Sequence, residues 1–230
     1  MQKIKYSLIA VVFALASCSE ETLPGELENF GIRYFPLEEG AFRIYDVSRI
    51  EFTLLESDTS SFQLRERITE AFDNDAGSIS YVVERSTRPD AGAPWVIDSI
   101  WTARVTESVA ILNENNVPLV KLVFPIIEDS EWDGNIFNSN DEDIYTYRNV
   151  FAPGEILGTV FNNTVTVVQS EISDNLILRD ERIEIYAEDV GLIHKDFVVL
   201  NFCARQDCLG QGIIDSGIIL KMDLIENGTE

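Results

Sequence analysis

Apolar and polar residues alternate with a period of two along much of this 230-residue chain. In the stretch FQLRERITEAF, Phe62, Leu64 and Ile68 are separated by polar residues such as Gln63 and Arg65. Successive side chains of a β-strand point to opposite faces, so this pattern predicts a strand with one face in a core and the other in water. The stretch RIEIYAEDVG alternates in the same way, and β-branched and aromatic residues, which favour strands, are frequent in both.

Polar turns divide the rest of the chain into further strand candidates. Turn residues gather in DNDAG at 73–77, RPDAGAP at 88–94 and NENN at 113–116. No segment of ten or more residues after the N-terminal stretch has a clear helical period. Strands joined by short turns pair as antiparallel hairpins, so residues 31–230 are expected to form a single antiparallel all-β domain, as a strongly curved sheet, an open barrel or a sandwich. The further candidates are residues 42–54, 79–87, 95–106, 108–112, 118–124, 144–150, 157–170, 192–202 and 213–225.

The first 17 residues have the pattern of an export signal. Lys3 and Lys5 supply positive charge, and an apolar run from 8 to 15 is too short for a bilayer span of about 20 residues. The tetrapeptide Leu15-Ala16-Ser17-Cys18 resembles the lipobox of bacterial lipoproteins, and this resemblance implies that Cys18 carries a diacylglycerol and becomes the first residue of the mature chain. The alternative is an ordinary signal peptide with an unrelated cysteine.

Residues 18–30 are polar and acidic and contain a Pro-Gly pair, so they are expected to form a flexible tether. The sequence Ser19-Glu20-Glu21 resembles the acidic tag that directs lipoproteins of Bacteroidota to the outer face of the outer membrane, although an acidic chain can carry two glutamates there for other reasons. We therefore expect a protein anchored in the outer membrane by lipid and exposed on the cell surface, with the periplasmic face as the alternative. Two acyl chains buried in the bilayer are enough for stable anchoring.

The mature chain is strongly acidic. Removal of residues 1–17 takes away two lysines and leaves 15 basic against 40 acidic residues, a formal charge of −25. Like charges repel, so this balance argues against nucleic acid and against anionic lipid headgroups as partner surfaces. We expect no cofactor, and a protein or glycan partner is not identified by the sequence.

Cys203 and Cys208 are spaced as C-x4-C in FCARQDCLG. In an oxidising compartment an even pair that closes a short polar loop is expected to be a disulfide. A metal site built on two cysteines would lack further ligands, because His194 is the single histidine of the chain. The spacing also differs from the redox motif C-x-x-C.

An acid-rich segment at 129–143 is a candidate calcium site. Asp133, Asn135 and Asn138 could offer oxygen ligands of the kind that calcium prefers. The EF-hand spacing is missing, however, and WDGN is a common tight-turn sequence. A solvated loop without metal is therefore the expectation, with calcium as the alternative.

Catalytic residues are not expected. A serine hydrolase triad would have to use His194, and no G-x-S-x-G motif is present. His194 lies in an apolar run and is expected to be a strand residue that faces solvent or a partner. Exposed tryptophans could stack on sugars, but strand alternation places Trp95, Ile97 and Trp101 on one face, which favours a core. A curled sheet with a lined interior could instead hold a lipid.

Four stretches resemble a family, the uncharacterised small lipoproteins of Bacteroidota. They are Tyr34-Phe35-Pro36-Leu37 with Gly40 and Tyr45, Trp132-Asp133-Gly134-Asn135 with Phe137-Asn138, Tyr186-Ala187 with Val190-Gly191-Leu192-Ile193, and Cys208-Leu209-Gly210 to Ser216-Gly217. The likeness covers most of the mature chain, although Phe42 and His194 stand where the family has aromatic residues of another type. The family implies no activity. We expect a non-enzymatic binding or structural component of the envelope, or alternatively a protein that binds a glycan or a lipid.

Overall fold

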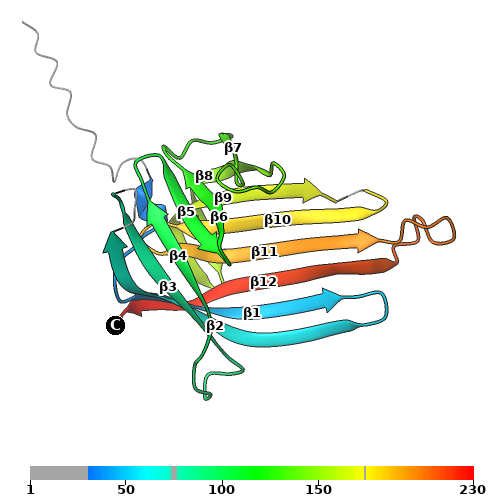
Figure 1. Ribbon diagram of the computed structural model, residues 1–230, viewed down its shortest axis with the longest axis horizontal. Helices are drawn as coiled ribbons and strands as arrows, with labels where there is room; N and C mark the ends of the chain where they lie inside the picture. Colours follow the sequence, from blue (N-terminus) through cyan, green and yellow to red (C-terminus); the bar gives the residue numbers. More distant parts are fainter. Residues whose placement is uncertain (1–30, 74–76, 174) are drawn as a thin grey trace, which may run out of the picture.

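The computed structural model describes residues 31–73, 77–173 and 175–230 (Figure 1). The predicted signal peptide at 1–17, Cys18 and the tether at 18–30 lie outside the described residues. Among the residues that are described, none belongs to a helix with the length and apolarity needed to cross a membrane.

The described chain begins with a short 3-10 helix, η2 (Ile32–Tyr34), and continues as twelve strands. All neighbouring strands are antiparallel and belong to one sheet, in the order β6-β5-β4-β3-β2-β1-β12-β11-β10-β9-β8-β7. The predicted all-β antiparallel fold is confirmed. The strands are β1 (Ala41–Phe52), β2 (Ser57–Asp73), β3 (Ile79–Arg88), β4 (Val96–Val105), β5 (Val109–Glu114), β6 (Val117–Val123), β7 (Glu131–Asp133), β8 (Ile144–Ile156), β9 (Thr159–Ile172), β10 (Leu178–Ala187), β11 (Gly191–Phe202) and β12 (Ile214–Thr229).

Local turn chemistry explains the boundaries of two hairpins. Asn115 and Asn116 adopt positive φ angles of 52° and 67° between β5 and β6, as a tight hairpin turn requires. Leu157 and Gly158 do the same between β8 and β9, with φ angles of 50° and 84°. The strand predicted at 157–170 therefore starts after this turn, β8 continues further than predicted, and the short β7 was not predicted.

The two ends of the sheet meet. β6 and β7 stand at opposite ends of the strand order, yet the backbone N–H of Val120 donates to the carbonyl of Gly134 at 2.9 Å. The indole Nε1 of Trp132 donates to the carbonyl of Val120 at 3.0 Å. The sheet is thus nearly closed like a barrel. Its largest core cluster lies inside the closed part and includes Ala110, Ile111, Val120, Leu122, Trp132, Tyr145, Tyr147, Val165, Val167 and Tyr186.

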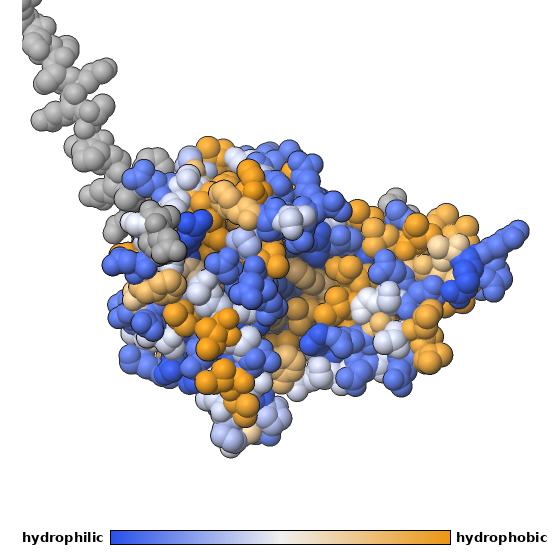
Figure 2. All heavy atoms as spheres, viewed as in Figure 1, coloured by the Kyte–Doolittle hydropathy of each residue, from blue (hydrophilic) through white to orange (hydrophobic). Residues whose placement is uncertain are grey.

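Only part of the sheet is covered in this way. In Figure 1, β4, β5 and β6 cross in front of the sheet at the left, whereas β1, β10, β11 and β12 continue to the right with no strand in front of them. Figure 2, seen from the same side, shows apolar side chains in the hollow beside the covered half. The molecule therefore has a closed half and an open half, and in the open half the inner face of the sheet meets solvent.

One expectation about the tryptophans is wrong. Trp101 is buried, but Ile97 is 59% exposed, and Trp95 lies on the outer face below the guanidinium groups of Arg65 and Arg88, at 5.0 and 4.1 Å from its ring centroid. The reason is a register shift in β4, where Ser99 pairs with Arg85 but Ile97 pairs with Ser86. This extra residue reverses the alternation of faces. Trp132 is also buried, with 8% exposure.

Candidate functional site

A small cavity of about 50 Å³ lies inside the closed half, and charged side chains line it. A water molecule needs roughly 10 to 15 Å³ measured in this way, so the cavity has room for a few waters or one small polar group. The chain departs here from the apolar interior usual for a small sheet protein. The charged lining residues are Arg43, Glu66, Arg85, Glu114, Lys121, Glu184 and Lys195, and apolar ones include Phe35, Leu37, Trp101, Leu112, Leu192 and Met222.

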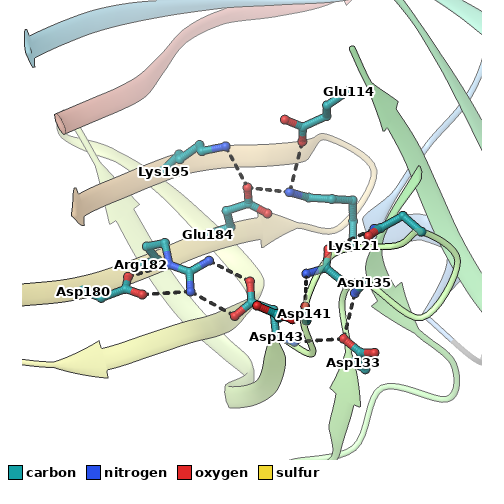
Figure 3. Close-up of polar contacts among 11 residues, drawn as sticks. Glu114, Lys121, Asp133, Asn135, Asp141, Asp143, Asp180, Arg182, Glu184 and Lys195 are labelled. Atoms are coloured by element: carbon teal, nitrogen blue, oxygen red, sulfur yellow. Dashed lines mark hydrogen bonds and ion pairs between the residues drawn. The ribbon is translucent and has the colours of Figure 1, made fainter. Parts of the chain in front are cut away.

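Glu184 is the centre of a charge cluster that we define as Glu114, Lys121, Glu184 and Lys195 (Figure 3). Its Oε1 accepts from the Lys121 ammonium at 2.7 Å and lies 3.2 Å from the Lys195 Nζ. Its Oε2 accepts from the Tyr186 hydroxyl at 2.7 Å. Lys121 also donates to Glu114 at 3.4 Å. Each buried charge of the cluster therefore has a partner of opposite sign.

The protonation states follow from these contacts. Burial raises the pKa of Glu184, but the charges of Lys121 and Lys195 outweigh burial and bring the pKa to about 2. Burial lowers the pKa of Lys121, but Glu184 and Glu114 outweigh it, and the pKa lies above its ordinary value. Burial and the Glu184 carboxylate raise the pKa of the Tyr186 hydroxyl, which therefore remains a donor. At neutral pH the charge cluster holds two carboxylates and two ammonium groups and is neutral.

A second pair lies across the cavity on β2 and β3. The Arg85 Nε lies 3.1 Å from Glu66 Oε1, and the two residues are direct neighbours in the β2–β3 register, where Glu66 pairs with Arg85. The Arg85 guanidinium also lies 3.7 Å from the ring centroid of Trp101, as in a cation–π contact. Glu66 and Arg85 therefore neutralise each other.

Arg43 on β1 is the cation of the cavity that lacks an acid. Its Nη1 donates to the carbonyl of Val190 at 3.0 Å, and within the described residues it forms no ion pair with a carboxylate. Its Nε is buried and has no hydrogen-bond partner in the part of the chain that the structure describes. The lining as a whole contains four cations and three carboxylates, so one positive charge is left over.

The inner face continues from the cavity into the open half. Lys195 and Met222 pair across β11 and β12 and line the cavity; two residues further along, Phe197 pairs with Leu220, and then Val199 pairs with Ile218. The Lys195 ammonium lies 4.1 Å from the Phe197 ring centroid, which places both side chains on one face. These four apolar side chains are all half-buried. We call them the open floor, which consists of Phe197, Val199, Ile218 and Leu220.

Charged residues next to the open floor are paired among themselves. Arg49 binds Glu51 on the same strand. Arg182 donates to both oxygens of Asp143 at 2.8 and 2.9 Å and to Asp180 at 2.6 Å (Figure 3). Burial lowers the pKa of Arg182, but its bonds to these two carboxylates outweigh burial and raise it. These charged groups therefore place no unpaired charge beside the open floor.

The structure brings the three calcium candidates together in one loop. The Asp133 Oδ1 accepts from the backbone N–H groups of Asn135 and Asp143 at 2.9 and 3.0 Å. Asn138 donates through its Nδ2 to the carbonyl of Pro118 at 2.9 Å and to the Asn135 Oδ1 at 2.9 Å. These side chains therefore fold the loop and fasten it to the start of β6, using oxygens that a metal would need.

His194 and the two cysteines lie away from the cavity. His194 is a strand residue as expected, but of the two expected surroundings, solvent or a partner, it does not face solvent: it is 8% exposed, and its Nδ1 lies 2.7 Å from Asp223 Oδ1 on the neighbouring strand β12. Cys203 and Cys208 form a disulfide, with their Cα atoms 5.8 Å apart, in the β11–β12 loop of the open half.

The sequence reasoning did not find the charge cluster. A signal was present, because Lys121 interrupts the apolar run VPLVKLV and Glu184 occupies an inward position in RIEIYA. The stretches that carry the family resemblance also contribute to the cavity lining, through Phe35, Leu37, Tyr186, Gly191 and Leu192.

The chain was compared with known families, sequences and structures. No protein-family profile matches the chain, and no curated protein sequence does. A solved structure from Bacteroides fragilis, provisionally named an exported protein with a YmcC-like fold, is 12% identical with a TM-score of 0.47, covering 85% of this chain and 98% of that one. A protein from Parabacteroides distasonis, provisionally named a lipoprotein, is 9% identical with a TM-score of 0.42, covering 87% and 99%.

Proposed function

We propose that this protein is a lipid-anchored component of the bacterial outer membrane that acts without catalysis, by binding an apolar or amphipathic ligand on the open floor. One observation carries the proposal: the sheet closes over only half of its inner face, and apolar side chains line the uncovered part. Ligand sites are typically concave and mostly apolar, with a few polar groups at one place. Here the open floor supplies the apolar surface, and the cavity supplies the polar groups.

A lipid fits this arrangement better than a glycan. Sugar binding by stacking needs an exposed aromatic face beside a concave surface. Trp101 and Trp132 are buried, and Trp95 lies on the outer face under two guanidinium groups. The open floor instead presents Phe197 and three aliphatic residues.

A non-enzymatic role is part of the proposal. His194 is bonded to Asp223, and within the described residues no serine or cysteine is hydrogen-bonded to its ring. The cavity carboxylates are held by ammonium or guanidinium groups. The ammonium groups of Lys121 and Lys195 lower the pKa of Glu184 and make it a weak proton acceptor. These features support binding as the activity of the cavity.

Two valines on β11 provide a matched test of ligand binding. Val199 belongs to the open floor, Val198 points to the other face of the same strand, and both are half-buried. We expect the fluorescence of 1-N-phenylnaphthylamine, an apolar probe, to rise and saturate with the wild-type protein and with Val198→Asp. Val199→Asp should lower the affinity for the probe at least about tenfold, because it places a charge on the apolar surface. Absence of saturable binding, or equal loss in both variants, would refute the proposal.

The location has its own test. Digestion of the protein on intact cells by added protease is expected for a surface-exposed domain, and protection would place it in the periplasm. A Cys18→Ala variant should leave the membrane fraction, since it cannot be acylated. Retention of this variant in the membrane would contradict the lipid anchor.

A further inference from the structure

The ligand can be defined more closely if the proposed function holds, because the cavity at the end of the open floor is charged and the floor is not. An acyl chain alone would use the open floor and leave the cavity without a role. The size and the charge of the cavity limit what it can hold. Both can be compared with the headgroups that acyl chains carry.

Size comes first. A cavity of about 50 Å³ admits a group the size of a few water molecules and excludes a phosphocholine or a sugar headgroup. A carboxylate has the required size. The inner face then leads from Met222 and Lys195 in the cavity to Leu220 and Phe197 on the floor, so a chain attached to that group can continue over apolar residues.

The charges of the cavity lining restrict the head of the ligand further. Three of the four cations in the lining have carboxylate partners: Lys121 and Lys195 pair with Glu184, and Arg85 pairs with Glu66. Arg43 has none within the described residues, and its Nε is buried and unsatisfied. A buried donor on a charged group is costly to leave without an acceptor. A single monoanion beside Arg43 would supply the acceptor and balance the lining.

We infer that the ligand is a monoanionic amphiphile with a small head, namely a long-chain carboxylic acid, whose carboxylate pairs with the Arg43 guanidinium in the cavity while its acyl chain lies on the open floor. The planar guanidinium matches a carboxylate because two N–H groups can donate to its two oxygens. The chain supplies affinity by burial, about 0.8 kcal/mol for each methylene group. Arg43 supplies the preference for an acid head.

The test compares two ligands that differ only in the head. Displacement of 1-N-phenylnaphthylamine by dodecanoate and by 1-dodecanol is measured at pH 8, with the full chain carrying Cys18→Ala in every sample so that no detergent is needed. We expect dodecanoate to displace the probe at a concentration at least about tenfold lower than dodecanol, as a charge-assisted hydrogen bond implies. Equal potency of the two ligands would overturn the inference.

Variants of two arginines on β1 complete the design. Arg43→Gln should remove the preference for the acid, and Arg43→Lys should restore part of it. Arg49→Gln is the matched control, because Arg49 lies on the same face of the same strand but is already paired with Glu51. Its preference should equal that of the wild type. Persistence of the preference in a folded Arg43→Gln protein, or its loss in Arg49→Gln, would overturn the role of Arg43.

The two proposals fail in different ways. Failure of the proposed function appears as no saturable probe binding at all. Failure of this inference appears as probe binding that dodecanoate and dodecanol displace equally. The comparison of the two ligands on the wild-type surface stands even where Arg43→Gln does not fold, which thermal unfolding of each variant will show.

Discussion

The carboxylate of Glu184 on β10 lies 2.7 Å from the ammonium group of Lys121 on β6, although three-quarters of the sheet separates these strands in hydrogen-bonding order. The ion pair thus joins β6, one of the strands that cover the closed half, directly to β10 in the part of the sheet beneath it. Glu184 is 1% exposed and Lys121 is 3% exposed. Two charges so deeply buried depend on each other for compensation.

Removal of one partner should therefore be costly. We expect Glu184→Gln to lower the free energy of unfolding by about 3 to 5 kcal/mol, the usual cost of leaving a buried charge without its partner. The matched control is Glu181→Gln on the same strand, whose partner Arg179 is partly exposed; it should cost less than about 1 kcal/mol. Urea unfolding measures both variants. The double variant Glu184→Leu with Lys121→Met should recover most of the loss, and equal destabilisation of single and double variants would contradict the coupling.

The same pair predicts how stability depends on pH. The pKa of Glu184 falls from 4.5 to about 2 on folding, so its contribution is fully present above pH 4.5 and is lost as the pH falls toward 2. The contribution is on the order of 3 kcal/mol. The pKa of Lys121 is raised, so its contribution is fully present below pH 10.5 and is lost only at higher pH. We expect a wide plateau around neutral pH and a decline below pH 4.5 that is smaller in the double variant. An identical loss of stability below pH 4.5 in the wild type and in the double variant would contradict this assignment.

The disulfide should stabilise the protein only locally. Cys203 and Cys208 are five residues apart, and so short a loop accounts for about 2 kcal/mol in the chain-entropy description. We expect Cys203→Ser with Cys208→Ser to remain folded, with a Tm lowered by a few degrees. Mass measurement after alkylation without reductant should find no free thiol at either position in the wild type. Two alkylated residues there would contradict the bond.

The loop at 129–143 is expected to be stabilised by its own hydrogen bonds. Asp133→Ala should cost about 1 to 3 kcal/mol, because two backbone donors lose their acceptor. Asp141→Ala, in the same loop, is the matched control, since Asp141 contributes its backbone carbonyl rather than its carboxylate. The Tm is expected to be the same with calcium and with chelator, because bound ligand would raise it. A rise with calcium that Asp133→Ala abolishes would show that the loop is a metal site.

Local features of the fold were predictable from the sequence. The alternation around Leu64 and the asparagine turn at 115–116 depend on neighbours within a few residues, so the strands and the hairpins could be read directly. The pairing of Cys203 with Cys208 is equally local. In each of these cases the interacting groups are close in the chain.

The face that a residue presents was less predictable, because one extra residue reverses it. The register shift between Ile97 and Ser99 moved Trp95 from the expected core to the outer face. The residue types at that point do not predict a bulge. The burial of His194 likewise depends on its partner Asp223, which comes from another strand.

The sequence by itself determined an all-β chain of antiparallel hairpins, because strand propensity, alternation and turn chemistry act over a few residues. Only the tertiary structure decided that the sheet closes over half of its inner face. That closure brings Lys121 to Glu184, and among the described residues it leaves Arg43 without an acid and the open floor uncovered. These relationships join strands that are distant in the sheet order, and their partners are fixed by the curvature of the whole sheet rather than by any spacing along the chain.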